Sequence, residues 1–255
     1  MLYNQNPNIA LIIIGNEILS GRTLDKNTQY VASRLAPLGV ELREVRVVAD
    51  IEGKIIAAVN ELRKTYDYVI TTGGIGPTHD DITSAAIAKA FGVELYRHPE
   101  AYAALAKHYG GEENLNHGRI KMTEIPENAE LIVNPISIAP GFKMDNVFVL
   151  AGVPEIMQAM LENVIPHLRR GVPVKSKTVQ VKTGESIIAG VMTELQNKYP
   201  NIDIGSYPYT NQPDSADGRH GTNIVFRSQD EKAIDAAIGE FAEALSKMKI
   251  NCERK

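Results

Sequence analysis

Tyr68-Val-Ile-Thr-Thr-Gly-Gly-Ile-Gly-Pro-Thr-His-Asp-Asp-Ile-Thr83 is the stretch that decides the fold. The apolar run at residues 68–70 predicts a buried strand, and three glycines follow it, Gly73, Gly74 and Gly76. A helix-like pattern of apolar and small residues then begins near Asp81. This order is the usual setting for a bound phosphate. Glycines let backbone amides approach an anion, and a helix N-terminus carries partial positive charge.

Two acids, Asp80 and Asp81, follow the glycines. Carboxylates repel a phosphate unless a cation lies between them, so we expect one acid to cap the helix and the other to hold a divalent cation. An architectural interpretation competes with this one, because such turns also occur merely to redirect the chain. The stretch lacks the Gly-Lys-Ser/Thr of a Walker loop, and Gly-Gly-x-Gly does not fit the dinucleotide-binding fingerprint.

Composition excludes several classes of protein. The net charge of -4 gives no electrostatic reason to expect binding to nucleic acid or to an anionic membrane. The single cysteine, Cys252, rules out an internal disulfide and a cysteine metal cluster. No apolar run approaches the ~20 residues of a membrane span, and the first residues do not resemble a secretory signal. We therefore expect a cytoplasmic protein.

Strand and helix patterns alternate in the first part of the chain. Residues 9–14 form an apolar run, residues 42–48 alternate apolar and charged residues, and helical patterns follow each of them. This order predicts a mostly parallel, doubly wound α/β sheet with helices on both faces. Ligands of such sheets bind at the carboxyl ends of the strands. Gly15-Asn-Glu17, Ala49-Asp50 and Thr72-Gly-Gly74 are all expected at that edge.

The later part of this region is predicted with less regular elements. Residues 98–124 are expected to be mostly helical, and residues 130–133 and 146–150 are expected to be strands. The region contains His98, His108 and His117, whose spacing indicates exposed histidines rather than a metal site. Asp50 also fits the position of a cap for the helix that follows it.

A linker at residues 169–173 predicts a division into domains at 1–171 and 172–255. The second domain shows the pattern strand-helix-strand-strand-helix, which indicates a small α+β module with helices on one face of a sheet. Residues 208–221 are predicted to be an exposed hairpin loop. The module has no aromatic pair for base stacking and no G-x-x-G loop flanked by basic residues. A structural or dimerisation role is therefore favoured over RNA binding.

A series of motifs resembles a known family. The motifs are Gly15-Asn-Glu-Ile-Leu-Ser-Gly21, Asp25-x-Asn27, Val48-Ala-Asp50, the glycine stretch, Asn134-x4-Ala139-Pro-Gly-Phe142 and Ala151-Gly-Val-Pro154. Together they resemble the molybdopterin-binding domain of the MoaB/Mog type, and within it the CinA (competence/damage-inducible protein A) branch. The resemblance covers about residues 8–170. The remainder resembles the small KH-like domain of CinA proteins, and we do not expect the amidase domain or the deamidase activity of their long form.

The resemblance implies a three-layer α/β/α domain that forms homo-oligomers. Mog-like members bind molybdopterin, and some transfer adenylate to it. The CinA branch is associated with metal-dependent cleavage of nucleotide diphosphates such as ADP-ribose, and related domains act on FAD. The acidic pair of the Mog-like domains maps onto Asp50 and Asp81, and the Gly-Asp-Glu segment maps onto Gly15-Asn16-Glu17.

This chain departs from the family pattern at three places, which bear on metal, substrate and activity. Asn16 replaces a common Asp, so that one potential cation ligand is neutral. Ala151 replaces a common Pro, and Ser137-Ile138 replaces the usual Gly-Thr.

Three hypotheses about function follow. The first is a hydrolase of nucleotide diphosphates that uses Mg²⁺, Mn²⁺ or Co²⁺. The residues assigned to it are Gly15, Gly73, Gly74 and Gly76 for backbone contacts, Thr78 and Thr83 as hydroxyl donors, Asp50 and Asp81 for the cation and catalysis, and Glu17 or Asp80 to complete the metal shell or activate water. A cap or an ion pair is the alternative role for Glu17. The second hypothesis is a non-hydrolytic protein that binds molybdopterin through the same loop, and the third is a structural or regulatory module.

Overall fold

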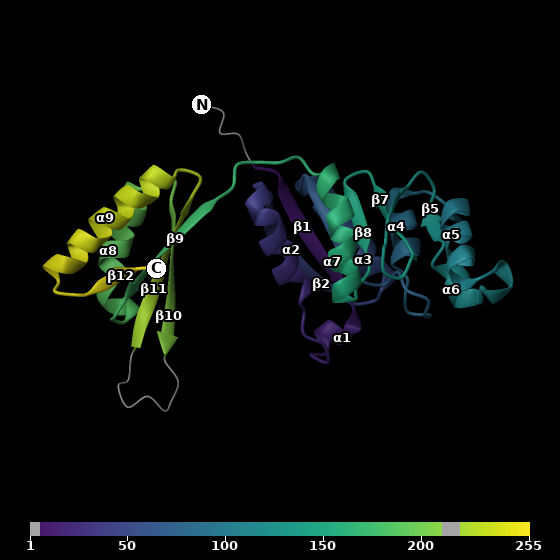
Figure 1. Cartoon of the computed structure of the whole chain (residues 1–255), viewed down its shortest axis with the longest axis horizontal. Coiled ribbons are helices and arrows are strands. Elements are labelled where there is room, and N and C mark those ends of the chain that lie inside the picture. Colours follow the sequence, from purple (N-terminus) through teal and green to yellow (C-terminus); the bar gives the residue numbers. More distant parts are fainter. Residues whose placement is uncertain (1–5, 211–219) are drawn as a thin grey trace. The chain divides into compact units, whose positions relative to one another are not determined.

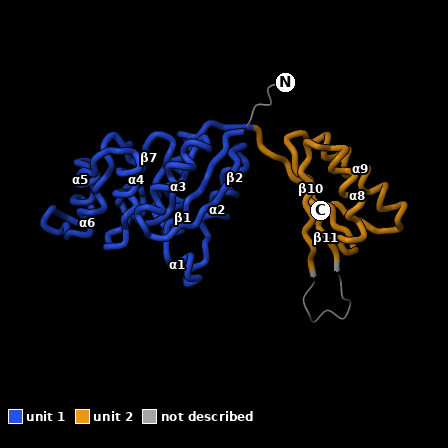
Figure 2. The backbone as a smooth tube through the Cα atoms, turned by 180° about the vertical axis from the view of Figure 1, so that it is seen from behind, with its two compact units in different colours: residues 1–171 blue, residues 172–255 orange. Residues whose placement is uncertain are grey.

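The computed structural model describes residues 6–210 and 220–255. The chain divides into two units, Met1–Gly171 and Val172–Lys255 (Figure 2). The boundary lies inside the linker predicted from the sequence, and each unit has a hydrophobic core of its own.

A mixed sheet of six strands forms the centre of the first unit, in the order β2-β1-β3-β8-β7-β6. These strands are β1 (Asn8–Ile14), β2 (Glu41–Val48), β3 (Tyr68–Thr72), β6 (Glu130–Ile132), β7 (Gly141–Met144) and β8 (Val147–Leu150). The pairs β2-β1, β1-β3 and β3-β8 are parallel, whereas β8-β7 and β7-β6 are antiparallel. The carboxyl ends of four adjacent strands therefore meet at one edge, and the strand order reverses beside β1.

Helices cover both faces of this sheet (Figure 1). Along β1, Ile9, Leu11 and Ile13 pack into one core with α2 (Asn27–Leu35) and α7 (Pro154–Val164). The alternate residues of β1 pack into the other core with α3 (Glu52–Thr65) and α4 (Thr83–Phe91). Successive side chains of a strand point to opposite faces, so an uninterrupted apolar run requires a sheet covered on both sides. The predicted three-layer α/β fold is confirmed.

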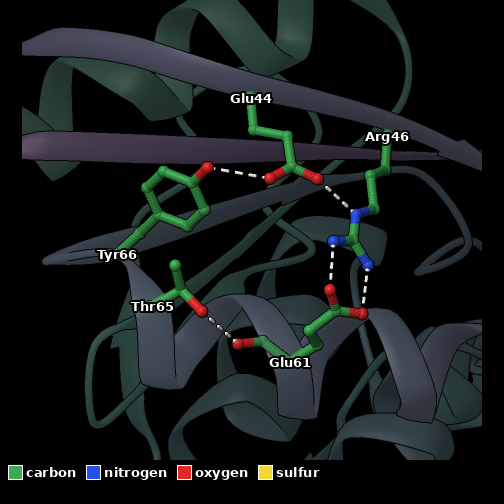
Figure 3. A network of polar contacts seen from close by, with 5 residues as sticks. All are labelled: Glu44, Arg46, Glu61, Thr65 and Tyr66. Carbon is green, nitrogen blue, oxygen red and sulfur yellow. Dashed lines mark hydrogen bonds and ion pairs between the residues drawn. The ribbon is translucent and has the colours of Figure 1, made fainter.

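The polar contacts of Arg46 fasten α3 to the edge strand β2 (Figure 3). The Arg46 guanidinium donates two hydrogen bonds to Glu61, at 2.6 and 2.7 Å, and a third to Glu44. Tyr66 donates its hydroxyl to the other oxygen of Glu44, at 2.8 Å. A bidentate Arg–carboxylate pair fixes geometry as well as charge. The network thus holds the strand that leads to Asp50.

Residues 95–126 form an insert at one end of the unit (Figure 1). Its elements are β4 (Leu95–Arg97), α5 (Pro99–Tyr109), η2 (Glu112–Asn114), α6 (His117–Lys121) and β5 (Glu124–Pro126). The prediction of a mostly helical segment is correct for α5 and α6. It missed the β4-β5 pair, whose strands of three residues each are too short to show a period of two.

The second unit is an antiparallel sheet with two helices packed on one core, as predicted. The sheet order is β10-β11-β9-β12, and the elements are β9 (Lys175–Val181), α8 (Glu185–Lys198), β10 (Asp203–Thr210), β11 (His220–Ser228), α9 (Glu231–Lys247) and β12 (Cys252–Arg254). The strand β12 was not predicted. Of the predicted hairpin loop, residues 211–219 lie outside the described residues. None of the helices in the described part of the chain is long and apolar enough to span a membrane.

Candidate functional site

A cavity of about 520 Å³ lies at the carboxyl edge of the first unit's sheet. It is lined by Ile14, Gly15, Glu17, Asp50, Gly73, Gly74, Ile75, Gly76, Pro77, Thr78, Asp80, Asp81, Tyr109, Met122, Asn134, Ser137, Ala139, Ala151, Gly152, Val153 and Ile156. The sequence-predicted site residues, apart from Thr83, are among these. The structure therefore brings together residues from the ends of β1, β2, β3 and β8. Their chemical roles remain predictions.

The glycine loop after β3 has a backbone that side chains would not tolerate. Gly73 and Gly74 have φ angles of +106° and +70°, in the left-handed region that favours glycine. A Cβ on Gly73 would lie 2.1 Å from the carbonyl oxygen of Ile14, and one on Gly74 would lie 2.1 Å from Oγ1 of Thr83. The loop is consequently packed against β1 on one side and against α4 on the other.

Thr83 holds this loop in place and does not line the cavity. Its side chain is fully buried, and its hydroxyl donates to the carbonyl oxygen of Gly73 at 2.9 Å. Its backbone amide donates to the carbonyl oxygen of Gly74, also at 2.9 Å. The single hydroxyl proton is thereby used within the loop. The predicted role of Thr83 as a hydroxyl donor to the ligand is replaced by a positioning role.

Thr78 links the two acids that follow the glycines. Its backbone amide donates to Oδ2 of Asp81 at 2.8 Å, and its hydroxyl lies within hydrogen-bond distance of both Asp80, at 2.6 Å, and Asp81. The hydrogen bond from Thr78 is the largest cause that lowers the pKa of Asp80, and the charges of His79 and Lys121 also lower it. Both acids were expected near the start of a helix, and one of them was expected to cap it.

That capping prediction is wrong. The helix α4 begins at Thr83, two residues later than expected, and its N-cap residue Ile82 makes no side-chain capping hydrogen bond. The carboxylate of Asp81 instead stabilises the turn at Thr78. Because neither carboxylate caps the helix, the N-terminus of α4 keeps part of its attraction for an anion, although the amide of Thr83 is already bonded to Gly74.

Asp50 does not cap the helix that follows it either. The N-cap residue of α3 is Ile51, which makes no side-chain capping bond. The Oδ2 atom of Asp50 accepts a hydrogen bond from the backbone amide of Asn16 at 2.8 Å. Asn16 is the first residue of the short helix α1 (Asn16–Leu19), which follows β1. Asp50 therefore joins the ends of β2 and β1 at the cavity.

Glu17 lies in α1 with its carboxylate folded back over Gly15. The carboxylate oxygens are 2.5 and 2.6 Å from the place that a Cβ on Gly15 would occupy. Glu17 is exposed, and no ion pair or hydrogen bond of its carboxylate is found within the described residues. The predicted alternatives for Glu17, an ion pair or a cap, are thus not seen there. An unengaged carboxylate at a cavity can accept a proton from water.

The acids around the cavity do not form a ready-made cation site. Within residues 6–210 and 220–255, no three His, Cys, Asp or Glu side chains are grouped so as to hold a metal ion. Mg²⁺ nevertheless keeps several waters and is usually held by one or two carboxylates together with phosphate oxygens of the substrate. Asp81 with Asp80, or Asp50, satisfies that lower requirement. The residues therefore fit a cation that arrives with a phosphate ligand.

Several lining residues were not assigned to the site from the sequence. Buried Asn134 donates from Nδ2 to the hydroxyl of Ser137 at 2.7 Å and to the carbonyl oxygen of Ala139 at 2.8 Å. Asn27 donates to the carbonyl oxygen of Gly152 at 2.9 Å, and the Cβ of a side chain at Gly152 would be 3.1 Å from Gly73. The sequence motifs at 25–27, 134–142 and 151–154 contain these residues and could have indicated their part in the site. The residues of these motifs hold the loops on either side of the glycine loop.

Comparison with known proteins gives matches for both units. The profile of a family described as a probable molybdopterin-binding domain matches residues 10–170, and that of the middle domain of FAD synthase matches residues 173–253.

Individual relatives and a solved structure are also similar to this chain. A protein of Archaeoglobus fulgidus is 30% identical over 236 residues, which span 92% of this chain and 97% of that protein. A putative competence-damage inducible protein of Clostridium botulinum is 32% identical over 238 residues, and the match spans 89% of this chain but 56% of its relative. The crystal structure of CinA from Thermoplasma acidophilum, a protein of unknown function, is 34% identical, with a TM-score of 0.60, and the alignment covers 64% of this chain and 99% of that one.

Proposed function

The chain belongs to the family of probable molybdopterin-binding domains, in the MoaB/Mog-like group that includes CinA, and from this we propose that it is a metal-dependent hydrolase of nucleotide diphosphates. ADP-ribose and FAD are the proposed substrate types. One observation carries the proposal, namely that the glycine loop and several carboxylates line the same cavity. The amide of Gly73 already donates to the carbonyl oxygen of Leu150 at 3.1 Å, so the proposal relies on the amides of Gly74 and Gly76. Amides suit a diphosphate, whereas carboxylates beside it need a cation.

The glycine loop is the proposed binding site of the diphosphate. Two hydrogen bonds from Thr83 fix the backbone conformation of Gly73 and Gly74, so the loop needs little reorganisation when an anion binds. The N-terminus of α4, a helix of nine residues, adds a favourable potential for negative charge. These features support binding of phosphate, whichever reaction follows.

The carboxylates are proposed to divide two tasks. Asp81 and Asp50, with Asp80 as a further ligand, would hold the divalent cation, which when bound neutralises charge on the phosphate oxygens. Glu17 would take a proton from the attacking water. The water oxygen forms a bond to one phosphorus, the bond from that phosphorus to the bridging oxygen breaks, and the bridging oxygen leaves on the other phosphate.

A non-hydrolytic protein that binds molybdopterin is the second candidate. The family description favours it, and the described acids do not form a complete cation site by themselves. In this case the glycine loop would hold the terminal phosphate of the pterin. The similarity of residues 173–253 to the middle domain of FAD synthase keeps a flavin nucleotide among the substrates to be tested.

A hydrolysis screen distinguishes the two candidates. ADP-ribose, FAD, NAD and CoA are incubated with the full chain and Mg²⁺, Mn²⁺ or Co²⁺, and molybdopterin binding is measured in parallel. Glu17→Gln should abolish most of the turnover but leave substrate binding, whereas Glu127→Gln, at an exposed residue outside the cavity lining, serves as the matched control. Molybdopterin binding without turnover of any diphosphate would favour the second candidate.

A further inference from the structure

One aromatic side chain lines the cavity, and the proposed phosphate chemistry does not use it. Tyr109, the last residue of α5, and Met122, which follows α6, line the cavity together with the glycine loop. Both belong to the insert at residues 95–126. Tyr109 is half-buried, so part of its surface remains accessible.

Arg119 covers one face of the Tyr109 ring. Its guanidinium carbon lies 3.6 Å from the ring centroid, a distance typical of a cation–π contact. Arg119 is itself fixed, because its guanidinium donates to the carbonyl oxygen of Asn114 and its backbone amide donates to Oδ1 of Asn116 at 3.0 Å. The ring of His108 also packs against Tyr109, with centroids 4.9 Å apart and planes at 76°, so a flat ligand is left the part of the Tyr109 ring that lines the cavity.

The insert contacts the glycine loop at two points. Lys121 donates a hydrogen bond to the carbonyl oxygen of Thr78. A Cβ on Gly118 would lie 2.8 Å from the carbonyl oxygen of Pro77, so α6 approaches the loop as closely as a glycine permits. Tyr109 is therefore held at a fixed position relative to the amides that would bind phosphate, which is the arrangement that preorganises a site for a ligand with two ends.

Ser137 supplies a further polar group in the lining of the cavity. Its hydroxyl oxygen accepts a hydrogen bond from Asn134, and its own proton is not donated to any group in the described part of the chain. Ser137 lines the cavity. The proton is thus available to an acceptor atom of a ligand. Ser137 is also one of the positions at which this chain departs from the family pattern.

We propose that Tyr109 is the stacking platform for a planar nitrogen-containing aromatic ring of the ligand, and that Ser137 donates a hydrogen bond to the edge of that ring. The proposal rests on the proposed function, because the ring is the one carried by the nucleotide or the pterin whose phosphate occupies the glycine loop. It adds a specificity: a phosphate ligand that lacks a ring is bound less tightly.

The test compares ligands with and without a ring on the full chain. Affinities for ADP-ribose, FAD, molybdopterin and inorganic pyrophosphate are measured for the wild type, Tyr109→Leu and Tyr109→Phe. Base–aromatic stacking predicts that Tyr109→Leu weakens the ring-bearing ligand by roughly 5- to 150-fold. Pyrophosphate affinity should stay within about twofold, and Tyr109→Phe should restore the binding that Tyr109→Leu loses.

Fluorescence gives an independent readout, since the chain contains no tryptophan. In Tyr109→Trp the introduced residue is the one tryptophan of the chain, so tryptophan emission reports on this position alone. Stacking of the adenine of ADP-ribose should quench its emission, whereas pyrophosphate should not.

The outcomes separate this inference from the function on which it rests. Unchanged affinity of Tyr109→Leu for every ring-bearing ligand would overturn the stacking platform and leave the proposed hydrolysis standing. An equal loss of affinity for pyrophosphate would overturn it too, because Tyr109 would then only support the glycine loop. A wild type that binds none of the ring-bearing ligands would remove both proposals.

Discussion

Substitution of Gly74 by alanine tests how the glycine loop is held. Gly74 has a φ of +70°, and a Cβ there would lie 2.1 Å from Oγ1 of buried Thr83. Thr83 cannot keep its hydrogen bond to the carbonyl oxygen of Gly73 and also make room for a methyl group. We therefore expect Gly74→Ala to destabilise the first unit through two separate effects, backbone strain and displacement of the threonine hydroxyl.

The magnitude follows from these two effects. A non-glycine residue in the left-handed region costs about 1–2 kcal/mol. A buried hydroxyl and carbonyl left without partners cost about 1–3 kcal/mol more. The expected loss of unfolding free energy is thus about 2–5 kcal/mol, by addition of the two costs. This is a large share of the roughly 5–15 kcal/mol that stabilises a typical domain.

Gly21 provides a matched control for the strain alone. Its φ of +72° equals that of Gly74 within 2°, and within the described residues no atom lies within 4 Å of the position of a Cβ. Urea unfolding followed by circular dichroism should give about 1–2 kcal/mol for Gly21→Ala and a larger loss for Gly74→Ala. In the double variant with Thr83→Ala, the losses should be less than additive by at least ~0.5 kcal/mol, the usual scatter of independent sites. Equal losses for Gly74→Ala and Gly21→Ala would refute the argument.

Three further predictions concern charge, pH and the division into units. Asp81→Asn and Asp50→Asn should each lower divalent-dependent turnover by at least about tenfold, with thermal midpoints close to the wild type, because an amide oxygen still accepts the bonds from Thr78 and Asn16; parent-like turnover in both variants would contradict the cation assignment. The pKa of Glu44 is held below its usual range first by the hydrogen bond from Arg46 and second by the hydrogen bond from Tyr66. The stabilisation that ionised Glu44 contributes is therefore fully present above about pH 4.3, the pKa of an unfolded Glu, and is lost as the pH falls through the lower pKa of the folded state. Acid titration of stability by circular dichroism should therefore be flatter below that pH in Glu44→Gln, and identical profiles would show that the network does not contribute. A chain truncated after Gly171 should keep the cavity's ligand binding, measured by calorimetry beside sedimentation, because the lining residues precede residue 157; a folded truncation of unchanged oligomeric state that no longer binds would place the second unit at the site.

The regular elements of the fold could be predicted because the sequence shows their burial as local patterns of apolar residues. Residues 9–14 and 68–70 are continuous apolar runs, and both became strands covered on two faces. The strands β4 and β5 have three residues each, and β12, Cys252–Arg254, is equally short. Such strands exist because a partner strand supplies their hydrogen bonds, and pairing between distant segments leaves no period in the sequence.

The phosphate side of the candidate site could be predicted for a topological reason. Glycines and acids that follow consecutive parallel strands must meet at one sheet edge, so Gly15, Asp50 and Gly73 converge without further information. The position of Tyr109 depends instead on how α5, η2 and α6 pack against the glycine loop. No spacing along the chain encodes that packing.

The incorrect capping predictions for Asp50 and for the acids near α4 arose because each carboxylate has another partner in the structure. In sequence, an acid just before a helical pattern has its neighbouring amides as the nearest donors, and capping is the statistical expectation. In the structure, the end of β1 offers Asp50 the amide of Asn16, and the tight turn offers Asp81 the amide of Thr78. A tertiary contact thus replaces the cap at Asp50, and a local turn contact replaces it at Asp81. The consequence is useful for experiment, because neither carboxylate is needed to begin α3 or α4. An exchange of either acid for asparagine therefore changes the charge at the cavity and leaves the helix starts intact.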